Sequence, residues 1–403
     1  MKNNDKTQQK KITVWGYMKN RDTIFATIAV FCVMGLLALI PINTHVLDPF
    51  KLALQDFNYN DLAYAKMGKN KNFAVDTNIV VVDIADAGRM EIANMIQSSV
   101  DAKAKVVGVD VLFNVAKDAV ADSMLKSLFN RNDKVVMAYN LADENHHFKH
   151  TGYFYSDARS KGYANFVGEE KGVIRYFKPQ VEDQKYLSFA TNIVKIAKPI
   201  AYDSLKERDK KIEIINYRRS SSKYLVVSGH KLLNGELESQ VLRNKIVLLG
   251  YVAKNEYDIE DKHYTPLNPL FAGRSTPDMN GVFIHANIVN MLLDEAYADK
   301  SPAWINWLIA FIFCWLHMAF FIKYSLEGHV WFHLKAKLVS LIMAVAFVYL
   351  GLWLFYHFDT QLNMTATLVA VILALDVLYF YESFALWLHK TKGYKTIFSH
   401  AAH

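Results

Sequence analysis

The sequence predicts a mixed α/β domain, with a largely parallel sheet flanked by helices, joined to a membrane region of four α-helical spans. Two observations predict this fold class. Four stretches are apolar enough to cross a bilayer, and a long polar block, residues 43–302, lies between the first and the second. Within this block, which we call the large domain, short runs of Val and Ile alternate with segments of helical periodicity. That alternation is typical of parallel strands connected by helices.

Three of the four spans contain no Asp, Glu, Lys or Arg, and each is close to the ~20 residues needed to cross ~30 Å of hydrocarbon. They are residues 23–42, 303–322 and 338–358. The fourth, residues 364–388, is long enough but contains Asp376 and Glu382. We expect it to span the bilayer as well, with three spans over 303–388, an N-terminal segment over 1–22 and a tail over 389–403.

Lys and Arg cluster beside the span ends that we expect to be cytoplasmic. They precede the first span, lie between the second and third, and follow the fourth: Lys10, Lys11, Lys19, Arg21, Lys323, Lys335, Lys337, Lys390, Lys392 and Lys395. The remaining short loop, residues 359–363, has no basic residue. Both termini are therefore predicted to be cytoplasmic, and the large domain to lie outside the cytoplasmic (inner) membrane, in the periplasm.

The first span is predicted to be an anchor rather than a cleaved signal, because residues 41–45 (PINTH) follow it instead of a small-residue cleavage site. The net charge of +7 reflects the basic span flanks, so it does not indicate nucleic-acid binding. Both cysteines, Cys32 and Cys314, lie within spans. The large domain must therefore be stabilised by its own core, without a disulfide.

Each element of the large domain is predicted from its own pattern. Apolar runs predict strands at 78–84, 105–113, 134–140, 211–217, 223–227 and 245–250. Apolar stripes at helical spacing predict two helices between the first three strands, through Ile92, Met95, Ile96 and Val100, and through Ala121, Leu125 and Leu128. A further helix is predicted over 281–293. Strand, helix, strand, helix, strand implies right-handed crossovers and a parallel sheet.

Short motifs follow one another in a recognisable order along this domain. They are 79–84 (IVVVDI), 107–113 (VGVDVLF), 162–165 (GYAN), 172–175 (GVIR), 215–217 (INY), 245–250 (KIVLLG), Asp258, 265–267 (TPL) and 281–287 (GVFIHAN). Their order resembles the CHASE type-two family, the second class of cyclase- and histidine-kinase-associated sensory extracellular domains. The resemblance covers roughly residues 48–293 and includes the arrangement of one span before the domain and three after it.

This resemblance implies an extracytoplasmic sensor that usually feeds a kinase, a cyclase or a similar output domain in the cytoplasm. Only 15 residues, 389–403, follow the fourth span, so we expect no output domain here. A signal would then pass to a separate partner membrane protein. Besides the lipid bilayer, we expect other membrane or envelope proteins as partners, and we also consider a homo-oligomer. In the alternative interpretation, the protein is a structural or scaffold subunit of a multiprotein envelope complex.

Enzymatic chemistry is not predicted. The sequence contains no Gly-x-Ser-x-Gly elbow, phosphate-binding Gly-rich loop, His-Glu-x-x-His or Cys-x-x-Cys motif. We expect no cofactor and no metal. The histidines of the tract His146, His147 and His150 are expected to be surface residues, since no Cys or carboxylate set accompanies them.

Asp83 and Asp110 are the candidate ligand-binding residues of the large domain. Both lie at or near the carboxyl ends of predicted parallel strands, where open sheets bind ligands. Alternatively, each carboxylate caps a helix or holds a loop. Asp118 and Asp122 are expected to share a solvated helix face, His285 to be a buried, hydrogen-bonded histidine, and Arg175 to pair with a carboxylate.

Asp376, Tyr379 and Ser383 are the candidate partner interface in the membrane. Asp376 lies eleven residues past Thr365, roughly 16 Å along a helix, so a carboxylate there should face protein or be protonated. Tyr379 and Ser383 continue the same face. His317 and Tyr349 are candidate internal partners. Three roles remain open: an intramolecular hydrogen bond that locks the helices, contact with a partner subunit, and proton or ion coupling.

Overall fold

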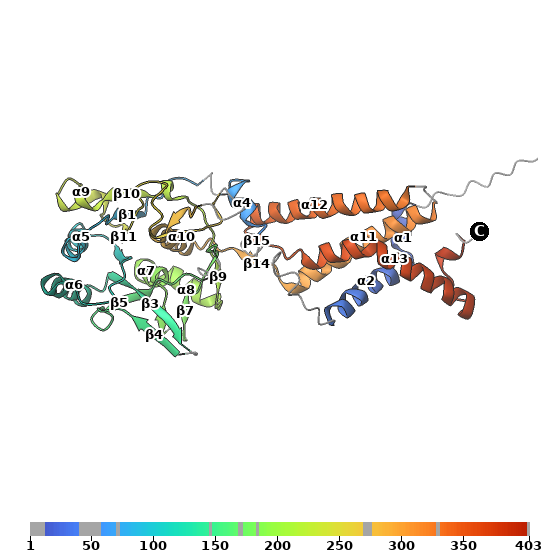
Figure 1. The fold of residues 1–403 in the computed structure, drawn as a ribbon, viewed down its shortest axis with the longest axis horizontal. Coiled ribbons are helices and arrows are strands. Elements are labelled where there is room, and N and C mark those ends of the chain that lie inside the picture. The colour runs from blue at the N-terminus through green and yellow to red at the C-terminus, as the bar shows by residue number, and fades with distance from the viewer. Residues whose placement is uncertain are drawn as a thin grey trace, which may run out of the picture. The chain divides into compact units, whose positions relative to one another are not determined.

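The computed structural model describes residues 13–39, 58–69, 73–144, 147–167, 172–182, 185–268, 276–327 and 331–400 (Figure 1). The chain divides into two compact units. One, Pro49–Asp299, is the large domain. The other, Met1–Asp48 with Lys300–His403, holds the apolar helices, and we call it the membrane unit.

A seven-stranded sheet forms the centre of the large domain, with strands in the order β10-β1-β11-β2-β3-β4 and with β5 paired to β3. The strands are β1 (Ile79–Asp83), β2 (Val106–Val109), β3 (Val135–Glu144), β4 (His147–Thr151), β5 (Ser160–Tyr163), β10 (Leu225–Ser228) and β11 (Ile246–Gly250). All the pairings are parallel except that of β3 with β4. The predicted fold class, a mixed α/β domain with a mostly parallel sheet, is confirmed.

Helices cover both faces of the sheet (Figure 1). Side chains that alternate along the strands, such as Val82 and Val109, pack on one face against α5 (Arg89–Asp101) and α6 (Ala119–Arg131). On the other face lie α7 (Phe189–Ala197) and α10 (Gly281–Leu293). Because both faces of the sheet are buried, the central strands consist of unbroken runs of apolar residues. These runs are the reason that the strands could be predicted from the sequence.

The remaining elements are short. They are α4 (Asp61–Ala65), β6 (Tyr176–Phe177) paired with β9 (Glu213–Ile214), β7 (Gln180–Val181) paired with β8 (Tyr186–Leu187), α8 (Pro199–Glu207), α9 (Gly229–Leu233), β12 (Lys262–His263) paired with β13 (Met279–Asn280), β14 (Asp299–Lys300), and 3-10 turns at Ser221–Lys223 and Ser239–Val241. The predicted strand over 211–217 was therefore too long. Only β9 is a strand, outside the main sheet, and the buried Glu213 in it pairs with Arg208.

Asp118 and Asp122 do not lie on a solvated helix face, so that expectation was wrong. Asp118 is the N-cap of α6 and accepts a hydrogen bond from the Ala121 N–H at 2.7 Å. Asp122 is buried and pairs with Arg89 at the start of α5. The two carboxylates thus start one helix and join it to the next. Arg175 pairs with a carboxylate as expected, through Asp61 of α4.

Glycine allows α7 to lie directly against the sheet. A methyl group at Gly162 in β5 would lie 2.5 Å from the Cα atom of Phe189, the first residue of α7. This neighbour is backbone and cannot rotate away. The close packing of α7 on β5 therefore depends on the absence of a side chain at this position.

We expect Gly162→Ala to lower the free energy of unfolding of the large domain by about 2 kcal/mol or more, as overpacking does in well-packed cores. Thermal unfolding of the purified protein measures this. Gly152→Ala is the matched control, because its methyl group would meet its nearest neighbour, Tyr139 Cβ, at an ordinary 3.4 Å. Equal stability of the two variants would contradict the assignment.

In the membrane unit, four helices are long and apolar enough to span a bilayer, as predicted. They are α2 (Arg21–Leu39), α11 (Ala303–Leu326), α12 (Phe332–Phe358) and α13 (Thr365–Lys392), accompanied by α1 (Val14–Met18), β15 (Thr360–Gln361) and a 3-10 turn at Ile397–His400. Small residues that are fully buried, including Ala26, Ala310 and Ala374, allow close approach of the helices.

Candidate functional site

The carboxyl edge of the parallel sheet holds both predicted ligand-binding residues, but the structure gives them different surroundings. Asp83 ends β1, and Asp110 follows β2 directly. β11 lies between these two strands, so the two residues are separated by two strand spacings, about 9–10 Å. Among the described residues, no hydrogen bond joins the two carboxylates.

Asp83 holds a loop. Its Oδ1 accepts hydrogen bonds from the N–H of Ala85 at 2.9 Å and from the N–H of Val252 at 3.2 Å. Val252 belongs to the segment that follows β11, so the carboxylate ties the ends of two neighbouring strands together. Asp83 therefore has the role given above as the alternative to ligand binding, which is to hold a loop.

Asp110 is different, because it is largely buried and faces other titratable groups. Its side chain is 13% exposed, and its Oδ1 lies 3.9 Å from Nε2 of His285 on α10. Burial and the negative charge of the nearby Asp261 raise the pKa of Asp110 to about 8. The carboxyl group therefore keeps its proton at neutral pH and can donate a hydrogen bond.

His285 is buried on α10, as predicted, but it is not fully hydrogen-bonded. Its Nδ1 has no hydrogen-bond partner among the described residues, which corrects the expectation of a satisfied histidine. The ring stacks on Phe166, with centroids 4.7 Å apart, and meets Phe189 edge-on at 5.1 Å. Burial, with His263 nearby, lowers the pKa of His285 to about 3, so the imidazole is neutral.

Asp261 and His263 complete this group, which we call the sheet-edge cluster: Asp110, Asp261, His263 and His285. The backbone N–H of Gly281, at the start of α10, donates to Oδ2 of Asp261 at 3.1 Å. His263 Nε2 lies 3.6 Å from Oδ1 of the same carboxylate. The Asp261 carboxylate thus accepts a hydrogen bond at the N-terminus of α10.

The sheet-edge cluster combines the protonated carboxyl group of Asp110, the neutral imidazole of His285, and the side chains of Asp261 and His263 at the edge where α/β sheets bind ligands. Such a set can exchange hydrogen bonds with a polar ligand. Among the described residues, no group of three or more His, Cys, Asp or Glu is arranged to hold a metal ion. His146 lies outside the described residues, and His150 stacks on Tyr155 with centroids 3.5 Å apart. Ligand binding by Asp83 or Asp110 remains a prediction.

In the membrane unit, Asp376 has an internal partner that the sequence did not indicate. Lys337 of α12 donates to both of its carboxylate oxygens at 3.2 Å. Neither His317 nor Tyr349 bonds to it: His317 Nδ1 donates to the carbonyl of Phe313, and Tyr349 is largely exposed. Lys337 lies near the N-terminal end of α12, so the pair lies toward that end of the helix rather than at its middle.

Tyr379 lies one turn after Asp376 on the same face of α13, as predicted, and it also contacts α12. A hydrogen bond of 2.8 Å joins its hydroxyl to Nδ1 of His333, and the two rings stack. Ser383, the third predicted residue, is exposed and makes no hydrogen bond among the described residues. We call His333, Lys337, Asp376 and Tyr379 the polar strip.

Asp22 in the first turn of α2 is an important residue that the sequence analysis missed. It is 1% exposed and accepts hydrogen bonds from the hydroxyls of Tyr381 at 2.8 Å and Tyr394 at 3.2 Å. It also accepts from Thr396 Oγ1 at 3.2 Å and from the N–H of Ile397 at 2.9 Å. One carboxylate therefore joins α2, α13 and the segment after α13. An acidic residue at the first turn of an apolar helix was the only signal.

The model of the family described as the CHASE2 domain matches residues 28–321. No curated protein and no solved structure matches the chain.

Proposed function

Because the chain belongs to the CHASE2 domain family, we propose that it is a non-enzymatic sensor or regulator that acts on a separate partner membrane protein. CHASE2 is an extracytoplasmic domain of sensory type, and the four apolar helices suggest a multi-pass membrane protein. The proposal adds that a signal passes from this chain to the partner membrane protein. It also places the protein in the inner membrane with both termini in the cytoplasm, which the Lys and Arg residues at the span flanks support.

The polar strip is the observation that carries this proposal. Lys337 and Asp376 form an ion pair on helices of span length, yet their side chains are 55% and 54% exposed. Apolar side chains on the same helix, including Leu334, Leu338 and Leu341, are also exposed. The ion pair is thus set in a surface that is otherwise suited to lipid.

A half-exposed charge pair on such a surface favours a protein neighbour over lipid. A single charge at the centre of a span costs ~2.5–3.5 kcal/mol, and less toward its ends. Lys337 and Asp376 compensate each other, but the ammonium keeps one or more free N–H donors and the carboxylate keeps free lone pairs. A partner helix with polar side chains would satisfy these groups, which lipid tails cannot do.

We expect Asp376→Asn to reduce recovery of the partner by about tenfold or more, because truncating one member of a charge pair that the partner buries costs ~2 kcal/mol or more. The measurement is purification from native membranes in mild detergent, followed by quantitative mass spectrometry. Glu382→Gln is the matched control, since Glu382 lies on the same helix outside the polar strip.

Unchanged recovery of the same proteins with Asp376→Asn would refute the role of the polar strip. A stoichiometric complex with several envelope proteins that withstands this substitution would favour the scaffold function instead. A lone protomer or homodimer that is stabilised by a small molecule would exclude the scaffold function.

A further inference from the structure

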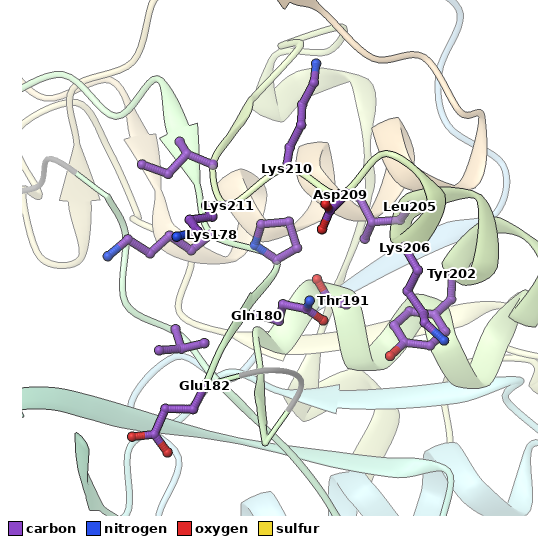
Figure 2. Close-up of a pocket in the computed structure, with 13 residues that line it drawn as sticks. Lys178, Gln180, Glu182, Thr191, Tyr202, Leu205, Lys206, Asp209, Lys210 and Lys211 are labelled. Carbon is purple, nitrogen blue, oxygen red and sulfur yellow. The ribbon is translucent and has the colours of Figure 1, made fainter. Parts of the chain in front are cut away.

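The large domain contains a cavity of about 490 Å³ beside α7 and α8, and none of the sheet-edge cluster residues is among those that line it (Figure 2). It is lined by residues 178–182, Thr191, Tyr202, Leu205, Lys206 and residues 209–212, and we call it the lysine pocket. Sites for small molecules usually measure ~300–1,000 Å³. The lysine pocket is therefore large enough for one small molecule.

The floor of the lysine pocket is mainly apolar and well ordered by its surroundings. Pro179, Thr191, Tyr202 and Leu205 are buried. Thr191 Oγ1 accepts a hydrogen bond from Ser188 at 2.7 Å, and Tyr202 lies under the ammonium of Lys206, 5.6 Å from the ring centroid. Because these side chains are held in place, the floor offers a preformed contact for an apolar ring or chain.

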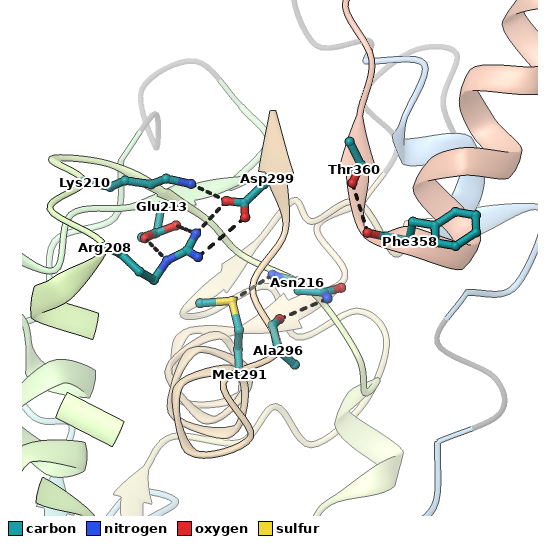
Figure 3. A network of polar contacts seen from close by, with 9 residues as sticks. All are labelled: Arg208, Lys210, Glu213, Asn216, Met291, Ala296, Asp299, Phe358 and Thr360. Carbon is teal, nitrogen blue, oxygen red and sulfur yellow. Dashed lines mark hydrogen bonds and ion pairs between the residues drawn. The ribbon is translucent and has the colours of Figure 1, made fainter. Parts of the chain in front are cut away.

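The rim of the lysine pocket carries an excess of positive charge. Four lysines and two acidic residues line it: Lys178, Lys206, Lys210, Lys211, Glu182 and Asp209 (Figure 2). Two of these six are already paired, because Glu182 bonds to Lys185 at 2.8 Å and Lys210 bonds to Asp299 (Figure 3). Within the described parts of the chain, Lys178, Lys206 and Lys211 have no carboxylate partner. The other charged groups of the lining are therefore three ammonium groups without a carboxylate partner and one carboxylate, that of Asp209.

We propose that the lysine pocket binds a soluble organic anion, a molecule that joins a phosphate or carboxylate group to an apolar body. The ammonium groups of the rim suit the anionic group, since lysine binds phosphate and carboxylate as a point charge. The floor suits the apolar body. Neither inorganic phosphate nor a neutral aromatic molecule would use both parts of the pocket.

The lysine pocket is also linked to the end of the large domain by a chain of ion pairs (Figure 3). Arg208 bonds to the buried Glu213 at 2.7 Å and to Asp299 at 2.5 Å, and Lys210 bonds to the same Asp299. Asp299 is followed, after residues 300–302, by α11. An anion in the pocket competes with Asp299 for Lys210 and so changes the segment that leads into α11. This last step rests on the proposed function, whereas binding itself does not.

The test is calorimetric titration of phenyl phosphate into the full-length protein in phosphatidylcholine nanodiscs. We expect saturable binding at one site per chain, weaker binding of inorganic phosphate, and no binding of benzyl alcohol. The variant Lys206→Gln/Lys211→Gln should bind phenyl phosphate about tenfold more weakly or worse, because two of the three uncompensated charges are lost. Lys134→Gln/Lys231→Gln is the matched control, since both lysines are exposed and lie outside the pocket.

Equal affinity of the two double variants, or no saturable binding to the wild-type protein, would overturn the proposal. Loss of phenyl phosphate binding in phosphatidylglycerol nanodiscs would assign the pocket to a lipid headgroup and would overturn a soluble ligand. Because no partner protein is present in the titration, its result is independent of the partner recovery that tests the proposed function.

Discussion

Asp22→Ala is expected to release the segment after α13 from the membrane helices and to destabilise the membrane unit by about 3 kcal/mol or more. The substitution removes the acceptor of four hydrogen bonds, from Tyr381, Tyr394, Thr396 and Ile397. Since the surroundings are buried, water cannot replace that acceptor without opening the structure. The buried Phe398, which packs in the hydrophobic core of the membrane unit, would be exposed with the segment.

Two measurements check this prediction. Thermal unfolding in detergent gives the loss of stability, and limited trypsin digestion gives the release of the segment, because Lys392 and Lys395 lie within or before it. Asp22→Asn keeps one carbonyl acceptor and should have a smaller effect. Ser383→Ala, at an exposed position of α13, is the control. If trypsin cuts Asp22→Ala no faster than the wild-type protein, the carboxylate does not hold the segment.

Asp110→Asn is expected to stabilise the large domain at pH 8 and to change little at pH 4. The folded pKa of Asp110 is about 8, whereas an aspartate in the unfolded chain has a pKa of ~3.9. Below pH ~4 both states hold the proton, so the buried carboxyl group costs nothing extra. Between pH ~4 and about 8 only the unfolded state releases it, and stability therefore falls as the pH rises.

Linkage sets the size of this effect. A shift of about four pKa units corresponds to ~5 kcal/mol at most, and relaxation of the wild-type site at high pH would reduce it to ~2–4 kcal/mol. Asparagine has no proton to lose, so the difference between variant and wild type should grow from pH 4 to pH 8. Hydrogen exchange in peptides from β2 and α10 measures it in this domain alone.

The control for this prediction is Asp86→Asn, at an exposed carboxylate close to the same sheet edge, which should alter stability little at either pH. His285 adds an opposite dependence, since its folded pKa of about 3 makes stability fall as the pH drops below ~6.5. Equal effects of Asp110→Asn at pH 4 and pH 8 would show that Asp110 is ionised in the folded protein.

The elements with continuous apolar patterns could be predicted from the sequence. The strands β1, β3 and β11 lie within a residue or two of their predicted starts, and α10 has the predicted bounds, Gly281–Leu293. Their patterns are strong because burial on both faces, or all around a helix, leaves no room for polar side chains. The segment over 211–217 (KIEIINY) has polar residues between its apolar ones and forms only two residues of strand, because its pairing with β6 depends on a distant segment.

The candidate sites show where sequence reasoning stopped. Asp83 is the last residue of β1 and Asp110 directly follows β2, and nothing in the local sequence distinguishes their roles. The structure does so, because the N–H of Val252 reaches Asp83, whereas His285 and Asp261 face Asp110. In the same way, Asp376 bonds to Lys337 because of the offset between α12 and α13, which no spacing rule within one helix can give.

Four apolar helices of span length, the largely parallel α/β domain and the family of the chain could all be predicted from the amino-acid sequence. These predictions follow from apolar periodicity and from the order of the motifs. Both are local properties of the sequence, and the periodicity reflects which side chains are buried. The surroundings of the carboxylates became known only from the folded chain: Asp376 pairs with Lys337, Asp83 accepts hydrogen bonds from two loops, and Asp22 holds the segment after α13. The pKa and the partners of a charged side chain depend on groups from distant segments that lie within a few ångströms of it. Local sequence patterns do not specify these tertiary contacts.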